Sequence, residues 1–72
     1  MTKHVIIHCQ PSIKDTVIKH NLSWSETLDQ DVPEIDVMVE DIDSLEDEEL
    51  CNHYNIDYHL VNCIEAYNFC AI

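Results

Sequence analysis

Residues 26–49 read ETLDQDVPEIDVMVEDIDSLEDEE, and the rest of the chain is organised around this stretch. Twelve of its 24 residues are Asp or Glu, and none is Lys or Arg. All three lysines precede it, so residues 1–25 carry a formal charge of +2 and residues 26–72 carry −14. Within it, residues 34–42 alternate apolar and mostly acidic side chains, which predicts a half-buried β-strand with a carboxylate-rich outer face.

The length and composition predict one folded domain spanning residues 1–72. A chain of 72 residues is near the lower size at which a single core holds without disulfides or metal. Its hydrophobic content of 46% argues against a disordered chain. The sequence contains no Gly, which excludes a Gly-rich phosphate-binding loop.

The remaining elements are expected on both sides of the acidic stretch. Residues 4–9 (HVIIHC) are rich in β-branched side chains and predict a second strand. Helices are expected where a Ser or Asp suited to capping precedes apolar residues at helical spacing: residues 12–20, 23–30, 44–55 and 57–68. The predicted fold class is α+β, with two short central strands, at about 4–9 and 34–42, covered by about four helices.

Short internal similarities suggest a repeat. Residues 5–7 resemble residues 37–39 at a spacing of 32, and residues 20–24 resemble residues 54–58 at a spacing of 34. These pairs are consistent with two strand–helix–turn–helix units, although coincidence accounts for them as well as duplication does. Asn21 is expected to end the first helix in a left-handed conformation. For residues 69–72 the sequence favours neither helix nor strand.

The cysteines bear on the compartment. The chain shows no signal peptide and no apolar run long enough to span a bilayer. We therefore expect a cytoplasmic protein, of an infected or host cell, whose four cysteines are reduced. In an oxidising compartment their even number would permit two disulfides.

Residues 47–65 resemble a helix-turn-helix. Leu50, Tyr54 and Ile56 occupy three of its spaced apolar positions, and Asn55 stands where that family has the turn Gly. The resemblance implies a helical hairpin, and a small regulatory or metal-binding adaptor, or an antitoxin-like protein, could use such a hairpin over residues 44–68. Direct nucleic-acid binding is not expected, because residues 58–65 contain no Lys or Arg to contact phosphates.

Catalytic and metal chemistry have weak support in the sequence. Four residues could hold Zn²⁺ on the predicted hairpin: Cys51, His53, His59 and Cys63. No Cys-x2-Cys spacing supports that site, and both cysteines also suit core positions, so no cofactor is expected. No nucleophile, base and orienting group fall at a recognisable spacing, so an enzyme is not expected either.

The acidic surface is the strongest functional candidate. Carboxylates at alternate strand positions lie about 6.5–7 Å apart, which is close to the spacing of phosphates along a nucleic-acid strand. The predicted partner-binding residues are Glu34, Asp36, Glu40, Asp41, Asp43, Glu46, Asp47, Glu48 and Glu49. A row of this kind suits the Lys/Arg groove of a nucleic-acid-binding protein. The alternatives are that the acids serve solubility, or, for residues 43–49, that they favour the start of a helix.

In size, acidity and lack of catalytic motifs, the chain resembles the small phage-encoded inhibitors of bacterial defence, the anti-CRISPR and anti-restriction proteins. The resemblance implies a nucleic-acid mimic that binds a basic surface of a host protein, such as a CRISPR complex or a restriction enzyme, and blocks its access to DNA or RNA. No direct contact with nucleic acid or membrane is implied.

Overall fold

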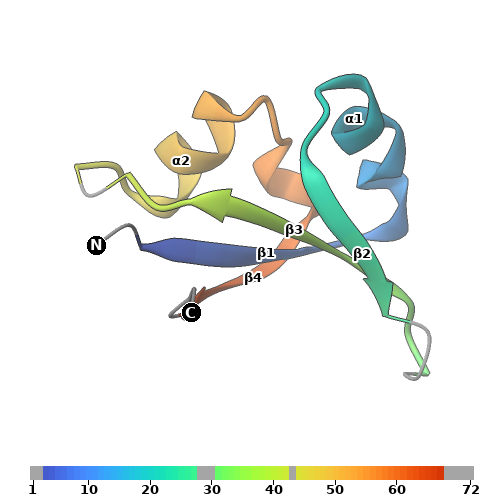
Figure 1. Cartoon of the computed structure of the whole chain (residues 1–72). Helices are drawn as coiled ribbons and strands as arrows, with labels where there is room; N and C mark the ends of the chain where they lie inside the picture. The colour runs from blue at the N-terminus through green and yellow to red at the C-terminus, as the bar shows by residue number, and fades with distance from the viewer. Residues whose placement is uncertain (1–2, 28–30, 43, 68–72) are drawn as a thin grey trace, which may run out of the picture.

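The computed structural model describes residues 3–27, 31–42 and 44–67. Within them the chain forms, in order, β1 (His4–Cys9), η1 (Pro11–Ile13), α1 (Lys14–Lys19), β2 (Ser23–Thr27), β3 (Glu34–Glu40), α2 (Asp47–His53), η2 (Tyr58–Leu60) and β4 (Val61–Tyr67), where η marks a 3-10 helix. The strands build one sheet, and both α-helices lie on the same face of it (Figure 1).

The sheet is antiparallel throughout, with the strand order β2-β3-β1-β4. β1 lies between β3 and β4, and β2 pairs with the other side of β3. The chain thus contains two strand–helix–strand units, β1-α1-β2 and β3-α2-β4, whose strands interleave. This is the connectivity of the ferredoxin-like βαββαβ motif.

Alternation along β1 and β3 builds the core between the sheet and the helices. Every second residue of both strands is buried, and helix residues close over them from one side. The buried residues are Val5, Ile7, Cys9, Ile13, Val17, Ile35, Val37, Val39, Leu50, Cys51 and Ile56. The three cysteines among the described residues (Cys9, Cys51 and Cys63) are free thiols.

The predicted fold of two strands under about four helices is wrong. The two expected central strands are present as β1 and β3, and they pair with each other. Of the four expected helices, however, two contain strands: residues 23–27 form β2 and residues 61–67 form β4.

Edge pairing explains the first error. Ser23 and Glu26 match a capping box, but a cap contributes only about 0.5–2 kcal/mol. As a strand, the same residues pair with β3 over five positions and turn Trp24 toward the core. The outer edge of β3 is thereby covered, which a helix at this position would not achieve.

A β-bulge explains the second error. Val61 lies opposite Cys9 and Ile64 opposite Ile7, and the register shifts between His8 and Cys9. The additional residue of the bulge lets two residues three apart face the same side of the sheet. A spacing of three is also that of a helix face, so the apolar pattern of a bulged strand is easily taken for a helix.

The predicted helix-turn-helix over residues 47–65, and with it the helical hairpin over residues 44–68, is therefore wrong. Its first helix is present as α2. Asp57 does cap a helical turn by accepting a hydrogen bond from the His59 backbone N–H at 3.0 Å, but that turn is the three-residue η2, which leads into β4. The repeated unit is accordingly strand–helix–strand rather than strand–helix–turn–helix.

The C-terminal ends of α1 and α2 agree with expectation, but their starts do not. α2 begins at Asp47 and not at residue 44, and no side-chain hydrogen bond caps the start of α1 or α2. Asn21 has φ of 54°, as predicted, and Asn55 has φ of 62° at the matching point after α2.

Residues 69–72, whose structure the sequence left open, lie outside the described residues. No helix in the described ranges is long and apolar enough to cross a membrane.

Candidate functional site

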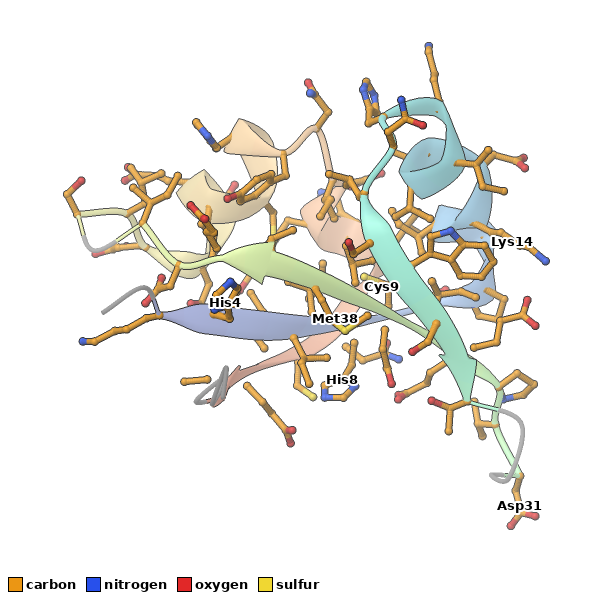
Figure 2. The ribbon with its side chains drawn as sticks, viewed as in Figure 1. His4, His8, Cys9, Lys14, Asp31 and Met38 are labelled. Atoms are coloured by element: carbon orange, nitrogen blue, oxygen red, sulfur yellow. The ribbon has the colours of Figure 1, made fainter. Side chains whose placement is uncertain are left out.

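The face of the sheet opposite the helices, here called the open face, carries a cluster of titratable side chains. Neither α1 nor α2 packs against it (Figure 1). Alternation directs His4 and His8 of β1 to this face, while Cys9 points to the helices (Figure 2). Strand pairing places Asp36 of β3 and Cys63 of β4 on either side of His8.

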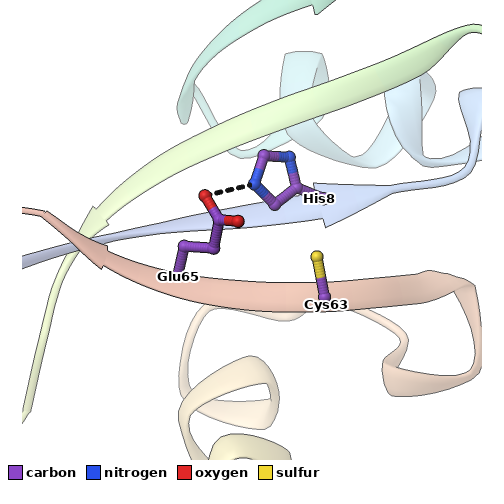
Figure 3. A group of neighbouring side chains, drawn as sticks. All are labelled: His8, Cys63 and Glu65. Atoms are coloured by element: carbon purple, nitrogen blue, oxygen red, sulfur yellow. Dashed lines mark ion pairs between the residues drawn. The ribbon is translucent and has the colours of Figure 1, made fainter.

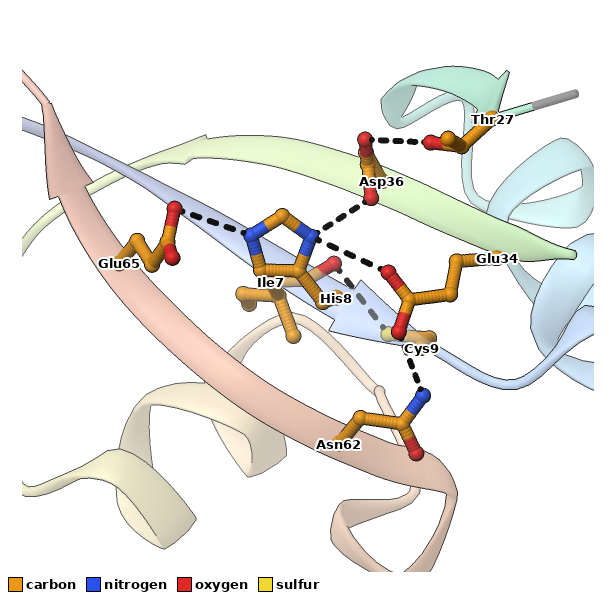
Figure 4. A network of polar contacts seen from close by, with 8 residues as sticks. All are labelled: Ile7, His8, Cys9, Thr27, Glu34, Asp36, Asn62 and Glu65. Atoms are coloured by element: carbon orange, nitrogen blue, oxygen red, sulfur yellow. Dashed lines mark hydrogen bonds and ion pairs between the residues drawn. The ribbon is translucent and has the colours of Figure 1, made fainter. Parts of the chain in front are cut away.

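His8 is the centre of the cluster, and its side chain is only 17% exposed. Its Nδ1 lies 2.7 Å from Asp36 Oδ1 and 3.6 Å from Glu34 Oε2, and its Nε2 lies 3.2 Å from Glu65 Oε2 (Figure 4). Since a carboxylate only accepts, the short contact with Asp36 is a hydrogen bond donated by the ring. At Nε2 the ion-pair distance is met, but no hydrogen bond is formed with the described residues, and the atom is shielded from solvent.

Two further contacts hold the carboxylates in place. Thr27 Oγ1 donates to Asp36 Oδ2 at 3.0 Å, and Asn62 Nδ2 donates to Glu34 Oε1 at 3.0 Å. The Asn62 contact reaches across the sheet from β4 to β3 (Figure 4). Together with His8 of β1, these donors come from three different strands, so the position of the carboxylates depends on the complete sheet.

Opposing effects act on the pKa of His8. Burial, the largest effect, lowers the pKa of the imidazole, while the hydrogen bond with Asp36, the polar contact with Glu65 and the charges of both carboxylates raise it. The carboxylates together prevail, and the pKa of His8 lies above its ordinary value of 6.5. His8 therefore keeps a proton more readily than a free histidine when no other cation occupies the cluster.

The cluster offers two sets of possible metal ligands. Ligand atoms of His8, Cys63 and Glu65 lie within 4.8 Å of one another, and the same is true of His8, Glu34 and Asp36. Burial, and then the charges of Glu65, Glu34 and Asp36, raise the pKa of the Cys63 thiol. A cation on this face would meet one imidazole, one thiol and three carboxylates.

A second acidic region lies where β3 ends and α2 begins. We call it the acidic edge and define it as Glu40, Asp41, Glu46, Asp47, Glu48 and Glu49. All of these except the half-buried Asp41 are exposed. A hollow of about 450 Å³ in this edge is lined by Glu46, Asp47, Glu48 and Tyr58. Tyr58 is 41% exposed.

Lysine side chains do not neutralise the carboxylates of the acidic edge in the part of the chain that the structure describes. Among the residues that the structure describes, one lysine–carboxylate ion pair is formed, between Lys14 and Glu26 at 2.9 Å. That pair joins α1 to β2, and α1 lies at the opposite end of the helical layer from α2 (Figure 1). The carboxylates of the acidic edge thus face solvent without a cationic partner in the described chain.

The predicted row of partner-binding residues is divided between two places. Glu34 and Asp36 lie on the open face and are engaged by His8, Asn62 and Thr27. Glu40, opposite His4, lies on the same face of β3 and continues into the acidic edge, which the remaining predicted residues form. Asp43 lies outside the described residues. The described residues do not form a single continuous row of carboxylates along β3 and α2, because α2 packs on the face of the sheet opposite Glu34 and Asp36.

The four metal candidates of the sequence are likewise separated. Cys51 is buried in the core, whereas Cys63 is exposed on β4. His53 is exposed at the end of α2, and His59 is exposed in η2. Both ligand sets that the described chain does form contain His8, which the sequence analysis did not select. Alternation in the sequence assigns His8 to the outer face of its strand, but only the register of β1 with β3 sets it directly opposite Asp36.

Comparisons with protein families, with curated proteins and with solved structures found no match for this chain.

Proposed function

We propose that the protein is a non-catalytic binding protein whose acidic edge occupies a basic, nucleic-acid-binding surface of a host protein and so blocks access of DNA or RNA. The observation that carries this proposal is the exposed acidic edge, whose carboxylates have no lysine partner among the described residues. The charge of −14 over residues 26–72 supports it as well.

The chemistry of the hollow suits a cationic side chain. Glu46, Asp47 and Glu48 surround it with negative charge, and Tyr58 offers an aromatic ring. A Lys or Arg of the partner could pair with the carboxylates and stack on that ring, a contact worth about 0.5–2 kcal/mol depending on its desolvation. The rest of the acidic edge would steer association and make it sensitive to salt.

The narrower form of the proposal is an inhibitor of a phage-defence nuclease, such as a CRISPR complex or a restriction enzyme. The small size and strong acidity of the chain support it, as does a carboxylate-lined edge that could stand in for phosphates. Because Glu34 and Asp36 are engaged by His8, the imitation of a nucleic-acid backbone is assigned to the acidic edge and not to the strand row.

A pair of matched variants tests the binding surface. The first, Glu46→Gln/Asp47→Asn/Glu48→Gln, neutralises the hollow. The control, Asp15→Asn/Glu26→Gln/Asp31→Asn, removes the same number of charges from exposed positions elsewhere. Tagged wild type and both variants are used to capture proteins from a bacterial lysate at low and at high salt, with identification by mass spectrometry. Circular dichroism confirms that each variant is folded.

We expect wild type and the control to retain a basic nucleic-acid-binding protein at low salt and to release it at high salt. The hollow variant should fail to retain it, and excess duplex DNA or guide RNA should displace it from wild type. The captured protein is then assayed for DNA cleavage, which wild type should inhibit and the hollow variant should not. If both variants bind equally, or binding is insensitive to salt, the proposal is wrong and the acidity serves solubility.

A further inference from the structure

We propose that the open face of the sheet binds a divalent transition-metal ion, preferably zinc, through His8 Nε2, Cys63 Sγ and a Glu65 carboxylate oxygen (Figure 3). This site is separate from the acidic edge and does not depend on the proposed function. An imidazole, a thiolate and a carboxylate together favour zinc over the hard cations magnesium and calcium, which prefer oxygen ligands alone.

The sheet places the three ligands without help from any loop. His8 and Cys63 are direct partners in the register of β1 and β4, and Glu65 lies two residues further along β4 on the same face. Their ligand atoms lie within 4.8 Å of one another. Tetrahedral ligands at the usual zinc distances are separated by roughly 3.3–3.8 Å. The proposed site requires the two exposed side chains, Cys63 and Glu65, to rotate and close that difference.

The surroundings of His8 prepare it as a ligand. Nδ1 donates to Asp36 Oδ1 at 2.7 Å, and Thr27 holds the other oxygen of Asp36 at 3.0 Å. Histidines that bind metals commonly donate their second ring nitrogen to a carboxylate in this way, which fixes the tautomer and makes the ligand nitrogen more basic. Here the arrangement leaves Nε2 with its lone pair, 3.2 Å from Glu65 Oε2 and without a hydrogen bond to the described residues.

The alternative ligand set on the Nδ1 side is less suitable. An ion bound by His8 Nδ1, Glu34 and Asp36 would have to replace the 2.7 Å hydrogen bond between His8 and Asp36. Both carboxylates are also held by other donors, Thr27 on Asp36 and Asn62 on Glu34. The Nε2 side meets no such competition, and it contributes the thiolate that zinc favours.

The proposed site has room for a fourth ligand. Cys63 and Glu65 are both exposed, so the side of the ion facing away from the sheet would be open to water. Three protein ligands with an open position distinguish this arrangement from a closed structural zinc site. Glu34 and Asp36 add negative charge close to the ion without occupying its ligand positions.

The test is a cobalt titration of the full chain after reduction and treatment with a chelator. Cobalt takes the ligands of zinc and reports a bound thiolate by a charge-transfer absorption band. We expect one Co²⁺ per chain with that band, displaced by one equivalent of Zn²⁺. Cys63→Ser should abolish the band, and His8→Gln should weaken binding at least about tenfold, because each removes a ligand. Cys70→Ser, which removes the thiol outside the described residues, should bind as wild type does.

A matched pair separates the positioning residue from the alternative ligand set. Asp36→Asn should weaken cobalt binding by roughly 10–100-fold, the usual effect of altering the group that orients a ligand histidine. Glu34→Gln removes the same charge from the same side of the ring and should have little effect. Equal losses in both variants, with no thiolate band, would place the ion at Nδ1 and overturn the proposal.

Two other results would also overturn it. One is a thiolate band that survives Cys63→Ser but disappears in Cys70→Ser. The other is the absence of any stoichiometric cobalt binding, which would leave His8 as an imidazolium paired with carboxylates. Circular dichroism verifies the fold of each variant. Because Cys63 is exposed, Cys63→Ser decides the outcome even if His8→Gln does not fold. The triple variant of the hollow should bind cobalt normally, so failure here is distinguishable from failure of the proposed function.

Discussion

His8 and Cys9 are neighbours in the sequence, yet they belong to opposite sides of the molecule. Cys9 is fully buried in the core, where burial, followed by the charges of Cys51, Asp36 and Glu34, raises the pKa of its thiol to about 12. His8 faces the open side and three carboxylates. Because side chains alternate between the two faces of a strand, adjacent residues place a thiol in the core and a histidine among carboxylates on the open face.

The thiols should differ in reactivity. In a Cys70→Ser background at about pH 8, we expect a thiol-specific reagent to modify Cys63 in the native protein, because it is exposed. Cys9 and Cys51 should react only after unfolding, since burial raises the pKa of Cys51 as well, to about 11, and a protonated thiol is a poor nucleophile. Raising the pH should increase the rate at Cys63 first. Peptide mass spectrometry identifies the modified sites, and native modification of Cys9 as fast as that of Cys63 would contradict its burial.

Core packing predicts a large effect at Ile7. Its side chain is 0% exposed and lies between Val37 of β3 and Ile64 of β4. Ile7→Ala should lower the free energy of unfolding by about 2–5 kcal/mol, much of the total for a small domain. Ile18, which is 53% exposed on α1, is the control, and Ile18→Ala should change the value by less than about 0.5 kcal/mol. Urea denaturation followed by circular dichroism measures both, and equal effects would contradict the assigned core.

At the scale of elements, the sequence predicts the central strands and the C-terminal ends of the helices well, and the outer strands poorly. β-Branched residues and alternation of apolar with polar residues indicate β1 and β3, and each strand is buried on one face. β2 and β4 are outer strands, so pairing with those two decides their conformation more than local preference does. Strand pairing is not visible in one short segment, and the bulge in β4 additionally gives its apolar residues helical spacing.

The same reason limits what the sequence says about the site. The acids of the acidic edge could be named from composition and from their position around a helix start. The His8 cluster could not, because it unites residues of β1, β3 and β4 that are 26 or more positions apart between strands. Once the antiparallel register of β1 with β3 is given, the proximity of His8 and Asp36 follows directly. The sequence therefore shows which titratable side chains the protein has, but not the strand topology that brings them together.

The end of α2 gives a prediction at this scale. Asn55 has φ of 62°, a conformation that side chains with a Cβ tolerate poorly and Gly adopts freely. Asn55→Ala should therefore lower the free energy of unfolding by about 1 kcal/mol, and Asn55→Gly should be neutral or slightly stabilising. Urea denaturation of both variants measures the difference. If Ala and Gly have equal effects, the left-handed turn between α2 and η2 is wrong.

At the scale of the whole molecule, the second strand–helix–strand unit, β3-α2-β4, places its acids on two different surfaces. The carboxylates of the open face surround His8, and those of the acidic edge face solvent. Under the two proposals, the open face would bind a small cation, and the acidic edge would bind the basic surface of a protein. The division means that neutralising one set of acids leaves the other intact, which is why the two proposals can be tested independently.

The net charge predicts how salt acts on the fold. The formal charge is −12, and the molecule measures 34 × 28 × 20 Å. At an ionic strength of about 0.01 M the Debye length is about 30 Å, so most carboxylates repel one another across the whole protein, whereas at about 1 M it falls to about 3 Å. Sodium chloride should therefore stabilise the native state between these limits, by on the order of 1 kcal/mol, because it screens self-repulsion.

The triple variant of the hollow, Glu46→Gln/Asp47→Asn/Glu48→Gln, sharpens this expectation. Asp47 and Glu48 lie in the first turn of α2, where negative charge is favourable by about 0.3–1 kcal/mol each at low salt. Their neutralisation loses that term but relieves repulsion within the acidic edge, so the net change in Tm at low salt is small. The increase of Tm with sodium chloride, measured by thermal unfolding, should nevertheless be smaller in the variant than in wild type. A Tm that falls with added salt would instead mean that the ion pairs of Lys14 with Glu26, and of His8 with its carboxylates, outweigh self-repulsion.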